Sequence, residues 1–287
     1  MKIRKIGING LGKMGLAVAE RLLELGESIA VHTRNKEKYA LLEQTGNITY
    51  CQTPKSLIDE CGFIINLLFG DQSVEETYLE KDGYLEADLD GKCIIEMTTI
   101  KPETAMMIAT KVKQKEGIFI ESPVSGTVGP ARNGKLMALV GADPDDLVLA
   151  TDVLNLITRK IIHAGAIGQG SMLKLVINLP LAIYWQSIKE AYDLAKVANM
   201  DINLVLEALA ESGISTRVLT HKIDTIIGNN NECGFDVSMM IKDINCILSV
   251  YGEQPKALEA LNAAMKSYQD LDINGMNKSD ACMIINP

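Results

Sequence analysis

Hydrophobic residues in the first half of the chain follow two alternating patterns. Short apolar runs of strand length are separated by segments in which apolar residues recur every three or four positions, which is helical spacing. This alternation predicts a parallel sheet that is covered by helices on both faces, because parallel strands need long crossover connections. The predicted strands are 3–9, 28–33, 62–69, 92–97, 117–121, 135–140 and 159–163.

From residue 171 onward the apolar spacing is almost entirely helical. One long helix is expected over 171–199, with a kink at Pro180. Shorter helices are expected over 201–212, 215–228, 236–251 and 254–269. The change of pattern predicts an α/β domain over residues 1–165 and an all-α domain over residues 166–287, joined by the long helix.

A glycine-rich segment, Gly10-Leu11-Gly12-Lys13-Met14-Gly15, joins the first predicted strand to the helix after it. Gly10 would allow a tight turn, Gly12 would let the backbone approach a pyrophosphate, and Gly15 would let strand and helix pack closely. The helix N-terminus would face the anion. This context favours a dinucleotide-binding Rossmann domain over a purely structural turn. The cofactor-binding residues expected here are Gly10, Gly12, Lys13, Met14 and Gly15.

The end of the second predicted strand indicates which dinucleotide is bound. NAD sites usually place Asp or Glu there to hold the ribose hydroxyls, but this strand ends in Thr33 and Arg34. A guanidinium cannot accept a hydrogen bond, whereas its planar fork matches a 2′-phosphate. We therefore predict NADP, with Thr33, Arg34 and Lys38 around its 2′-phosphate. NAD is the possible second cofactor. The alternative is that Arg34 is only solvated and that Glu37 binds the hydroxyls.

Three later strand ends carry further candidate residues. In open α/β sheets, ligands bind at the carboxyl ends of the strands. Leu68 lies at the end of the third predicted strand, and Thr99 and Ser125 follow the fourth and fifth. The two hydroxyl groups are suited to contacts with a ribose or a substrate.

Lys174 and Asn178 are polar residues in a helical stretch that is otherwise apolar as far as Trp185. They are four residues apart, so they share one face of the predicted helix. Burial would lower the pKa of a lysine toward values that suit proton transfer. The alternative is an ordinary amphipathic helix whose lysine reaches solvent.

Composition narrows the possible partners. The 287 residues carry a formal net charge of −9 and a sequence pI of about 5.0, which argues against nucleic-acid or anionic-membrane binding. Six cysteines without metal-site spacing and only three histidines predict no metal. No secretory signal leads the chain and no apolar run is long enough for a membrane span, so we expect a cytoplasmic protein with reduced cysteines.

Taken in order, five segments resemble the β-hydroxyacid dehydrogenases, the family of 3-hydroxyisobutyrate dehydrogenase, tartronate semialdehyde reductase and the glyoxylate/succinic semialdehyde reductases. The segments are 7–15, 96–102, 122–126, 168–178 and the pair Lys242-Asp243. The resemblance covers essentially the full length. It implies hydride transfer between NADPH and a small carboxylate-bearing hydroxy acid or semialdehyde, with a C-terminal domain for substrate binding and oligomerisation. Fold analogy suggests a homodimer or homotetramer.

The resemblance also implies roles for individual residues. Lys174 would donate or accept the proton, with Asn178 and Ser125 as further catalytic residues. Lys242 would reach the cofactor from the second domain, and the alternative for it is a surface charge pair with Asp243. The substrate-binding residues implied are Ser125, Gly126, Thr127 and Asn178.

Two departures from the family pattern lie in the expected site. Thr127 stands where most members carry a second glycine, and Ile177 stands where most carry asparagine. Ile177 and the short length argue against the 6-phosphogluconate dehydrogenases, which have histidine there. Lys174 favours alcohol and carbonyl chemistry over the imine reductases, which share the fold and usually carry Asp or Tyr at this position. An imine reductase and a non-catalytic NADP-binding protein are the alternative functions.

Overall fold

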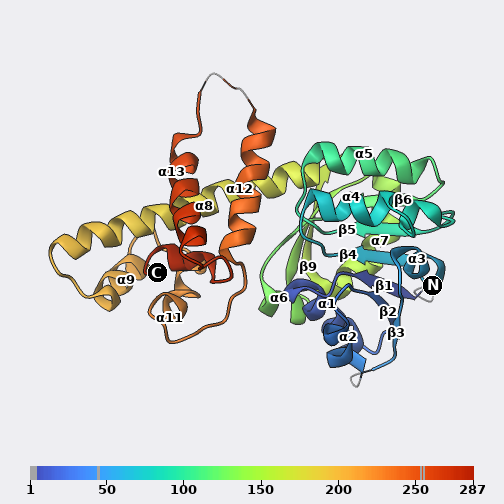
Figure 1. Ribbon diagram of the computed structural model, residues 1–287, viewed down its shortest axis with the longest axis horizontal. Helices are drawn as coiled ribbons and strands as arrows, with labels where there is room; N and C mark the ends of the chain where they lie inside the picture. Colours follow the sequence, from blue (N-terminus) through green and yellow to red (C-terminus); the bar gives the residue numbers. More distant parts are fainter. Residues whose placement is uncertain (1–4, 44–45, 253, 255) are drawn as a thin grey trace. The chain divides into compact units, whose positions relative to one another are not determined.

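The computed structural model describes residues 5–43, 46–252, 254 and 256–287 and divides into two compact units, Met1–Lys174 and Leu175–Pro287 (Figure 1). The division falls inside the long helix α8 (Gln169–Val197). The boundary expected after residue 165 lies just before the start of that helix. Each unit is described by itself below.

The first unit is built on a sheet in which nine strands are described. They are β1 (Ile6–Asn9), β2 (Ile29–His32), β3 (Ile48–Tyr50), β4 (Phe63–Asn66), β5 (Cys93–Glu96), β6 (Ile118–Glu121), β7 (Val124–Ser125), β8 (Leu136–Gly141) and β9 (Thr158–Gly165). Their order is β3-β2-β1-β4-β5-β6-β8-β7, with β9 paired to β8. The strands from β3 to β6 in this order are parallel.

Successive strand residues face opposite layers of helices, which explains why the strands are apolar throughout. Ile8 and Ile65 pack with α1 (Lys13–Glu24), α6 (Val128–Arg132) and α7 (Pro144–Ile157). Ile64 and Ile94 pack with α3 (Pro54–Glu60), α4 (Asp71–Leu79) and α5 (Pro102–Lys113) on the other face (Figure 1). The remaining elements of this unit are α2 (Lys36–Glu43) and the short 3-10 helix η1 (Tyr84–Glu86). The predicted doubly wound α/β fold is confirmed.

The last part of the sheet differs from the predicted parallel arrangement. β8 runs antiparallel to β6 and β7, and β9 runs parallel to β8. Only the short helix α6 separates β7 from β8, and so short a connection cannot make the crossover that parallel strands need. The hydrophobic pattern does not predict β3, β7 or α6, because elements of two to five residues are too short to show a period.

The described part of the second unit consists of helices and one bridge between Asp236 and Asp280. After α8 the helices are α9 (Ile202–Glu211), α10 (Arg217–Thr220), α11 (Ile223–Ile226), α12 (Val237–Tyr251), α13 (Glu259–Ile273) and the 3-10 helix η2 (Ala281–Ile284). Buried residues such as Trp185, Met240 and Tyr268 join α8, α12 and α13 in one core. The predicted all-α domain is confirmed.

Three helix predictions for this unit need correction or comment. The helix expected over 215–228 is divided into α10 and α11 at Lys222, whose ammonium lies 2.6 Å from the buried carboxylate of Asp280. The helix expected over 254–269 is instead Glu259–Ile273, and an acidic first residue suits a helix N-terminus. Pro180 lies within α8, which continues as one helix to Val197.

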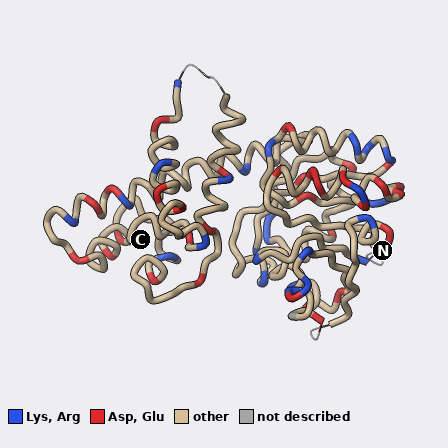
Figure 2. Tube along the Cα trace, viewed as in Figure 1, with Lys and Arg blue, Asp and Glu red and all other residues tan. Residues whose placement is uncertain are grey.

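Charged residues of both signs occur over both units (Figure 2). Acidic residues gather on α4, which contains Asp71, Glu75 and Glu76 (Figure 2). Among the helices of the described residues, none is both long and apolar enough to cross a membrane.

Candidate functional site

The turn between β1 and α1 accepts only glycine at two of its three glycine positions. Gly10 has φ of +91°, and a Cβ atom there would lie 2.4 Å from the carbonyl oxygen of Leu67. A Cβ atom on Gly15 would lie 1.8 Å from the carbonyl oxygen of Gly10. Both distances are far shorter than a van der Waals contact, so these glycines allow the turn to pack against the sheet and the helix.

At Gly12, in contrast, no neighbouring atom of the described residues excludes a side chain. Gly12 is the N-cap of α1 with φ of −64°, and a Cβ atom there would have no described heavy atom within 4 Å. No side chain caps this helix, and its first turn contains no acidic residue. An open, uncapped helix N-terminus attracts an anionic group. The turn therefore fits the pyrophosphate of a dinucleotide, with Lys13 and Met14 beside it at the start of α1.

Thr33 and Arg34 follow β2 and have opposite environments. Thr33 is buried, and its Oγ1 accepts a hydrogen bond from the backbone N–H of Asn35 at 3.2 Å, which shapes the turn. The side chain of Arg34 is 82% exposed, and its guanidinium lies 3.6 Å from the carboxylate of Glu76 on α4. Glu37 is exposed in the first turn of α2. Arg34 can therefore turn toward a ligand at the loss of only a weak surface ion pair.

A row of buried polar residues crosses the sheet where its parallel strands end. The strands β1, β4, β5 and β6 each end in a polar residue that is at most 2% exposed, and the four are in register: Asn9, Asn66, Glu96 and Glu121. Buried polar groups are stable only when they are hydrogen-bonded. The carboxylate of Glu96 binds a segment that follows its own strand, and the carboxylate of Glu121 binds the start of α8.

Glu96 joins the loops that follow β4 and β5. Its carboxylate accepts from Asn66 Nδ2 at 2.8 Å and from the backbone N–H of Thr98 at 3.0 Å. The hydroxyl of Thr98 in turn accepts from the backbone N–H of Leu68 at 2.9 Å. Burial raises the pKa of Glu96, although these hydrogen bonds oppose the shift. The network fixes the two loops that carry the predicted cofactor contacts Leu68 and Thr99.

Glu121 attaches the N-terminus of α8 to the end of β6. Its Oε1 accepts from the backbone N–H of Gly170 at 2.7 Å, and its Oε2 accepts from the hydroxyl of Ser171 at 2.7 Å. Lys174 follows one turn later and is half-buried. Glu121 lies at the carboxyl end of its strand, as Asn9 does just before the glycine-rich turn. The structure thus brings Lys174 to the edge of the sheet that carries this turn.

Asn178 and Lys242 belong to the second unit and share one partner. The Nδ2 of Asn178 donates to Asp243 Oδ2 at 2.5 Å, and the ammonium of Lys242 lies 2.6 Å from Asp243 Oδ1. The side chain of Lys242 is 19% exposed and that of Asp243 is 2% exposed. A surface charge pair, the alternative for Lys242, does not describe this arrangement. The contact of Lys242 with the cofactor stays a prediction.

The predicted substrate loop lies at the end of β7. Ser125 is half-buried and pairs with Met137 of β8, while Gly126 and Thr127 are exposed. Gly126 has φ of +133°, which favours glycine. Thr127 is the N-cap of α6, yet its hydroxyl does not cap that helix.

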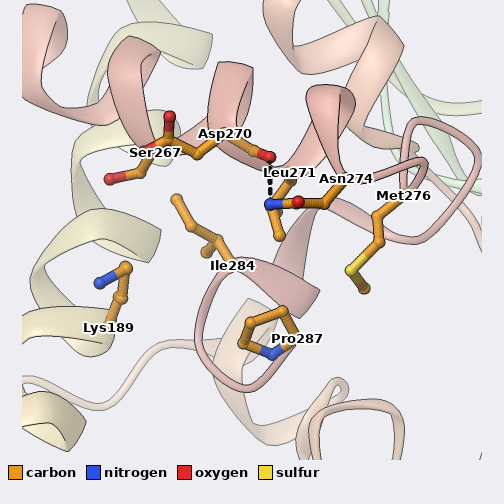
Figure 3. Close-up of a pocket in the computed structure, with 8 residues that line it drawn as sticks. All are labelled: Lys189, Ser267, Asp270, Leu271, Asn274, Met276, Ile284 and Pro287. Atoms are coloured by element: carbon orange, nitrogen blue, oxygen red, sulfur yellow. Dashed lines mark hydrogen bonds between the residues drawn. The ribbon is translucent and has the colours of Figure 1, made fainter.

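A pocket of about 360 Å³ lies in the second unit, and Figure 3 shows the side chains that line it. Lys189 of α8, Asp270 and Leu271 of α13, and Ile284 line it. The amide of Asn274 at its rim donates to the backbone carbonyl of Asp270 at 2.8 Å. No predicted site residue lines this pocket.

Sequence reasoning did not assign roles to Glu96 and Glu121, and it took Asp243 only as the partner of Lys242 in the pair that the family resemblance implies. The first two could have been noticed, because each is a single charged residue at the end of an apolar strand. Their distant partners could not have been, because Asn66, Gly170 and Ser171 lie 30 to 50 positions away in the sequence. The same holds for the bond between Asn178 and Asp243.

The doubly wound sheet and its open glycine-rich turn define the first unit as a Rossmann-type dinucleotide-binding domain. Residues 5–165 match the family model of the NAD binding domain of 6-phosphogluconate dehydrogenase. Residues 168–287 match the model described as NAD-binding of NADP-dependent 3-hydroxyisobutyrate dehydrogenase. The chain belongs to the β-hydroxyacid dehydrogenase family of NAD(P)-dependent oxidoreductases.

Relatives and solved structures match along nearly the whole chain. An uncharacterised oxidoreductase of Bacillus subtilis is 29% identical over 276 residues, which are 96% of either chain. Glyoxylate/succinic semialdehyde reductase 1 of Arabidopsis thaliana is 26% identical over 284 residues, which are 98% of this chain and 97% of the relative. The structure of Psf3 in complex with NADP+ and 2-OPP shares the fold with a TM-score of 0.89 at 22% identity, over 98% of both chains.

Proposed function

We propose that the chain transfers hydride between NADPH and a small semialdehyde or hydroxy acid, with Lys174 as the proton donor or acceptor. The observation that carries this proposal is the attachment of α8 to the end of β6, which brings Lys174 to the edge of the sheet where the glycine-rich turn lies. The Arabidopsis relative, named for glyoxylate and succinic semialdehyde, supports this substrate class.

The bound nicotinamide would supply or accept the hydride. The protein would handle the proton and the developing charge. A carbonyl that is being reduced gains negative charge on its oxygen, and the ammonium of Lys174 would stabilise this charge and then donate the proton. Asn178, whose amide is held by Asp243, would orient the reacting oxygen. In the oxidation direction the neutral amine of Lys174 would accept the proton instead.

The substrate carboxylate would bind at the loop after β7. Ser125 would donate its hydroxyl, and the exposed backbone around Gly126 would donate N–H groups. Lys242 would add positive charge, which an acidic protein with net charge −9 needs in order to hold an anion. Thr127 and Ile177, which depart from the family pattern, would set the shape of the substrate-binding site.

The cofactor preference that we propose is NADP over NAD. Arg34 supports it, because its guanidinium is exposed at the end of β2, where the adenine ribose of a Rossmann cofactor lies. The solved neighbour with NADP+ and the 3-hydroxyisobutyrate dehydrogenase model are in line with this preference.

We also propose a cytoplasmic homodimer or homotetramer. None of the six cysteines, all of which lie in the described residues, forms a disulfide, which suits a reducing compartment. Leu194, Val197 and Ile273 expose 74%, 82% and 82% of their surface in the second unit, and exposed apolar side chains of this size are common at subunit contacts.

The proposed activity predicts that Lys174→Ala abolishes turnover while NADPH still binds. Removing one general acid lowers a rate by about 100- to 10,000-fold, whereas the glycine-rich turn is untouched. NADPH oxidation would be measured with glyoxylate, succinic semialdehyde, methylmalonate semialdehyde, tartronate semialdehyde and a cyclic imine, and NADPH binding by fluorescence.

The matched control is Lys196→Ala, which removes an exposed lysine from the same helix. It should leave turnover unchanged. Turnover of Lys174→Ala within a few-fold of the unmodified protein would show that Lys174 is not the proton donor. Activity on the imine alone would assign the chain to imine reduction, and NADPH binding without any turnover would favour a non-catalytic role.

A further inference from the structure

The carboxylate of Glu121 is enclosed between the sheet and the first turn of α8. Glu121 is 1% exposed, and both of its oxygens accept short hydrogen bonds, one from Gly170 and one from Ser171. Enclosing a carboxyl group is unfavourable unless its oxygens are bonded in this way. The contact therefore has to be maintained whenever this helix is packed on the sheet.

The absence of a side chain at two glycines makes room for the carboxylate of Glu121. A Cβ atom on Gly141, the last residue of β8, would lie 2.1 Å from Glu121 Oε1. A Cβ atom on Gly170 would lie 2.5 Å from the carbonyl oxygen of Leu139 and 3.1 Å from the same Oε1. The backbone of α8 thus approaches β8 as closely as glycine permits. A larger residue at Gly170 would push the helix away from β8, and one at Gly141 would displace the carboxylate of Glu121.

The charge of Glu121 suits this helix terminus. The helix α8 is 29 residues long, and its first turn contains no acidic residue. The first N–H groups of a helix lack partners within it and carry a partial positive charge. Glu121 supplies from β6 both the acceptor and the negative charge that the first turn lacks. Burial raises the pKa of Glu121, and the hydrogen bonds from Ser171 and Gly170 oppose this shift.

Lys174 lies on the face of α8 that this contact fixes. It follows Ser171 by three positions and Gly170 by four, and residues at these spacings share one face of a helix. The residues of this arrangement all belong to the first unit: Glu121, Gly170, Ser171 and Lys174. The contact therefore sets both the position of the helix along its axis and its rotation at Lys174.

We propose that Glu121 is the positioning residue for Lys174: its carboxylate holds the first turn of α8 so that the ammonium meets the substrate oxygen. This inference rests on the proposed function, because Glu121 acts only through Lys174. A misplacement of about 1 Å at a reacting group can lower a rate about 100-fold, so a small shift of this turn is sufficient.

Two variants weaken the contact by different amounts. Ser171→Ala removes one hydrogen bond and leaves the carboxylate, whereas Glu121→Gln removes the charge and keeps the side-chain shape. We expect kcat to fall about threefold in Ser171→Ala and about tenfold or more in Glu121→Gln, with KM for NADPH within about threefold. Hydrogen–deuterium exchange of the peptide that contains residues 169–174 should become faster in both variants.

Leu154→Ala is the control for effects that come only from a general loss of stability. Leu154 is a fully buried residue of α7 in the core on one face of the sheet, so its truncation lowers Tm. Leu154→Ala should not accelerate hydrogen–deuterium exchange at residues 169–174. It should also not lower kcat while KM for NADPH stays nearly constant, which is the result expected for Ser171→Ala and Glu121→Gln. That result in Leu154→Ala would show that general destabilisation is the cause.

A double-mutant cycle with Lys174→Ala tests whether Glu121 acts through the lysine. Turnover of Lys174→Ala would be measured with methylamine added as a substitute proton donor. Adding Glu121→Gln to Lys174→Ala should then lower turnover less than about twofold, because no positioned lysine remains to be displaced. A further tenfold loss, or an unchanged kcat in Glu121→Gln despite faster exchange, overturns the proposal. Unmodified turnover in Lys174→Ala would instead overturn the proposed function, so the two failures are distinct.

Discussion

At the residue scale, we propose that the side chain of Arg34 at the end of β2 sets the choice between NADP and NAD. The guanidinium of Arg34 is directed toward Glu76, with 3.6 Å between the two charged groups. A 2′-phosphate would compete with this carboxylate for the guanidinium and would also be repelled by it. Glu76 would therefore oppose the NADP preference that we propose for Arg34, and the two effects can be separated by substitution.

Arg34→Ala should raise Kd for NADPH about tenfold or more and change Kd for NADH less than about twofold, because only NADPH carries the phosphate that pairs with the guanidinium. Glu76→Gln should tighten NADPH binding a few-fold by removing the competing charge. Fluorescence titration with both nucleotides measures these constants. Arg159→Ala, which removes an exposed arginine of β9, is the control. Equal losses for NADPH and NADH in Arg34→Ala would contradict the contact with the 2′-phosphate.

At the scale of elements, the turn between β1 and α1 combines two kinds of requirement. Gly10 and Gly15 are needed by the protein, since a Cβ atom on either would overlap a backbone carbonyl. Gly12 faces space that no described atom fills. Fold and ligand binding can thus be separated within six residues of one turn.

Gly12→Ala should leave Tm nearly unchanged and weaken NADPH binding by about tenfold or more, because the new methyl group occupies the space of the pyrophosphate. Gly15→Ala should lower Tm by several degrees or prevent folding, because its methyl group would overlap the carbonyl of Gly10. Thermal melts and NADPH titrations of both variants provide the comparison. Full NADPH affinity in Gly12→Ala would mean that the pyrophosphate does not lie beside this turn.

At the scale of the whole molecule, the two units are built on different principles. The first encloses a row of polar strand ends inside a sheet, whereas the second is a helical core around α8, α12 and α13. Stability should therefore respond to pH largely through the carboxyl groups that the sheet buries. Glu96 is the clearest case, because it is 0% exposed and burial raises its pKa.

We expect the stability of Glu96→Gln, relative to that of the unmodified protein, to increase as pH rises from about 4 toward neutrality. The increase should begin near the unfolded-state pKa of a glutamate, which is about 4.3. Above that pH the unfolded state releases its proton, while the raised pKa lets the folded state hold its proton to a higher pH, so the unmodified protein loses stability as pH rises through this interval. Glutamine has no proton to release. The difference in Tm between the two proteins, measured from pH 4 to 8, should change with pH.

The difference near pH 4 supplies the reference for this experiment. There Glu96 is protonated in most unfolded molecules as well as in the folded state, so the difference reports mainly the hydrogen bonds that glutamine alters with Asn66 and Thr98. A difference in Tm that stays constant from pH 4 to 8 would contradict a raised pKa at Glu96.

The sequence by itself determined the features that local patterns encode. Apolar runs locate β1, β2, β4, β5 and β6, the glycine spacing locates the turn after β1, and the change of period at residue 171 locates α8. Each of these depends on residues that are neighbours in the chain, so a period or a short motif is sufficient to reveal it. The family followed from the order of such motifs.

Only the tertiary structure decided which distant residues meet. Glu121 bonds to Ser171 fifty positions later, and Asn178 bonds to Asp243 sixty-five positions later. The antiparallel direction of β8 and the division of the helix at Lys222 likewise depend on neighbours in space. No sequence period records such pairings, because a buried carboxylate is stabilised by whichever donors the fold brings to it.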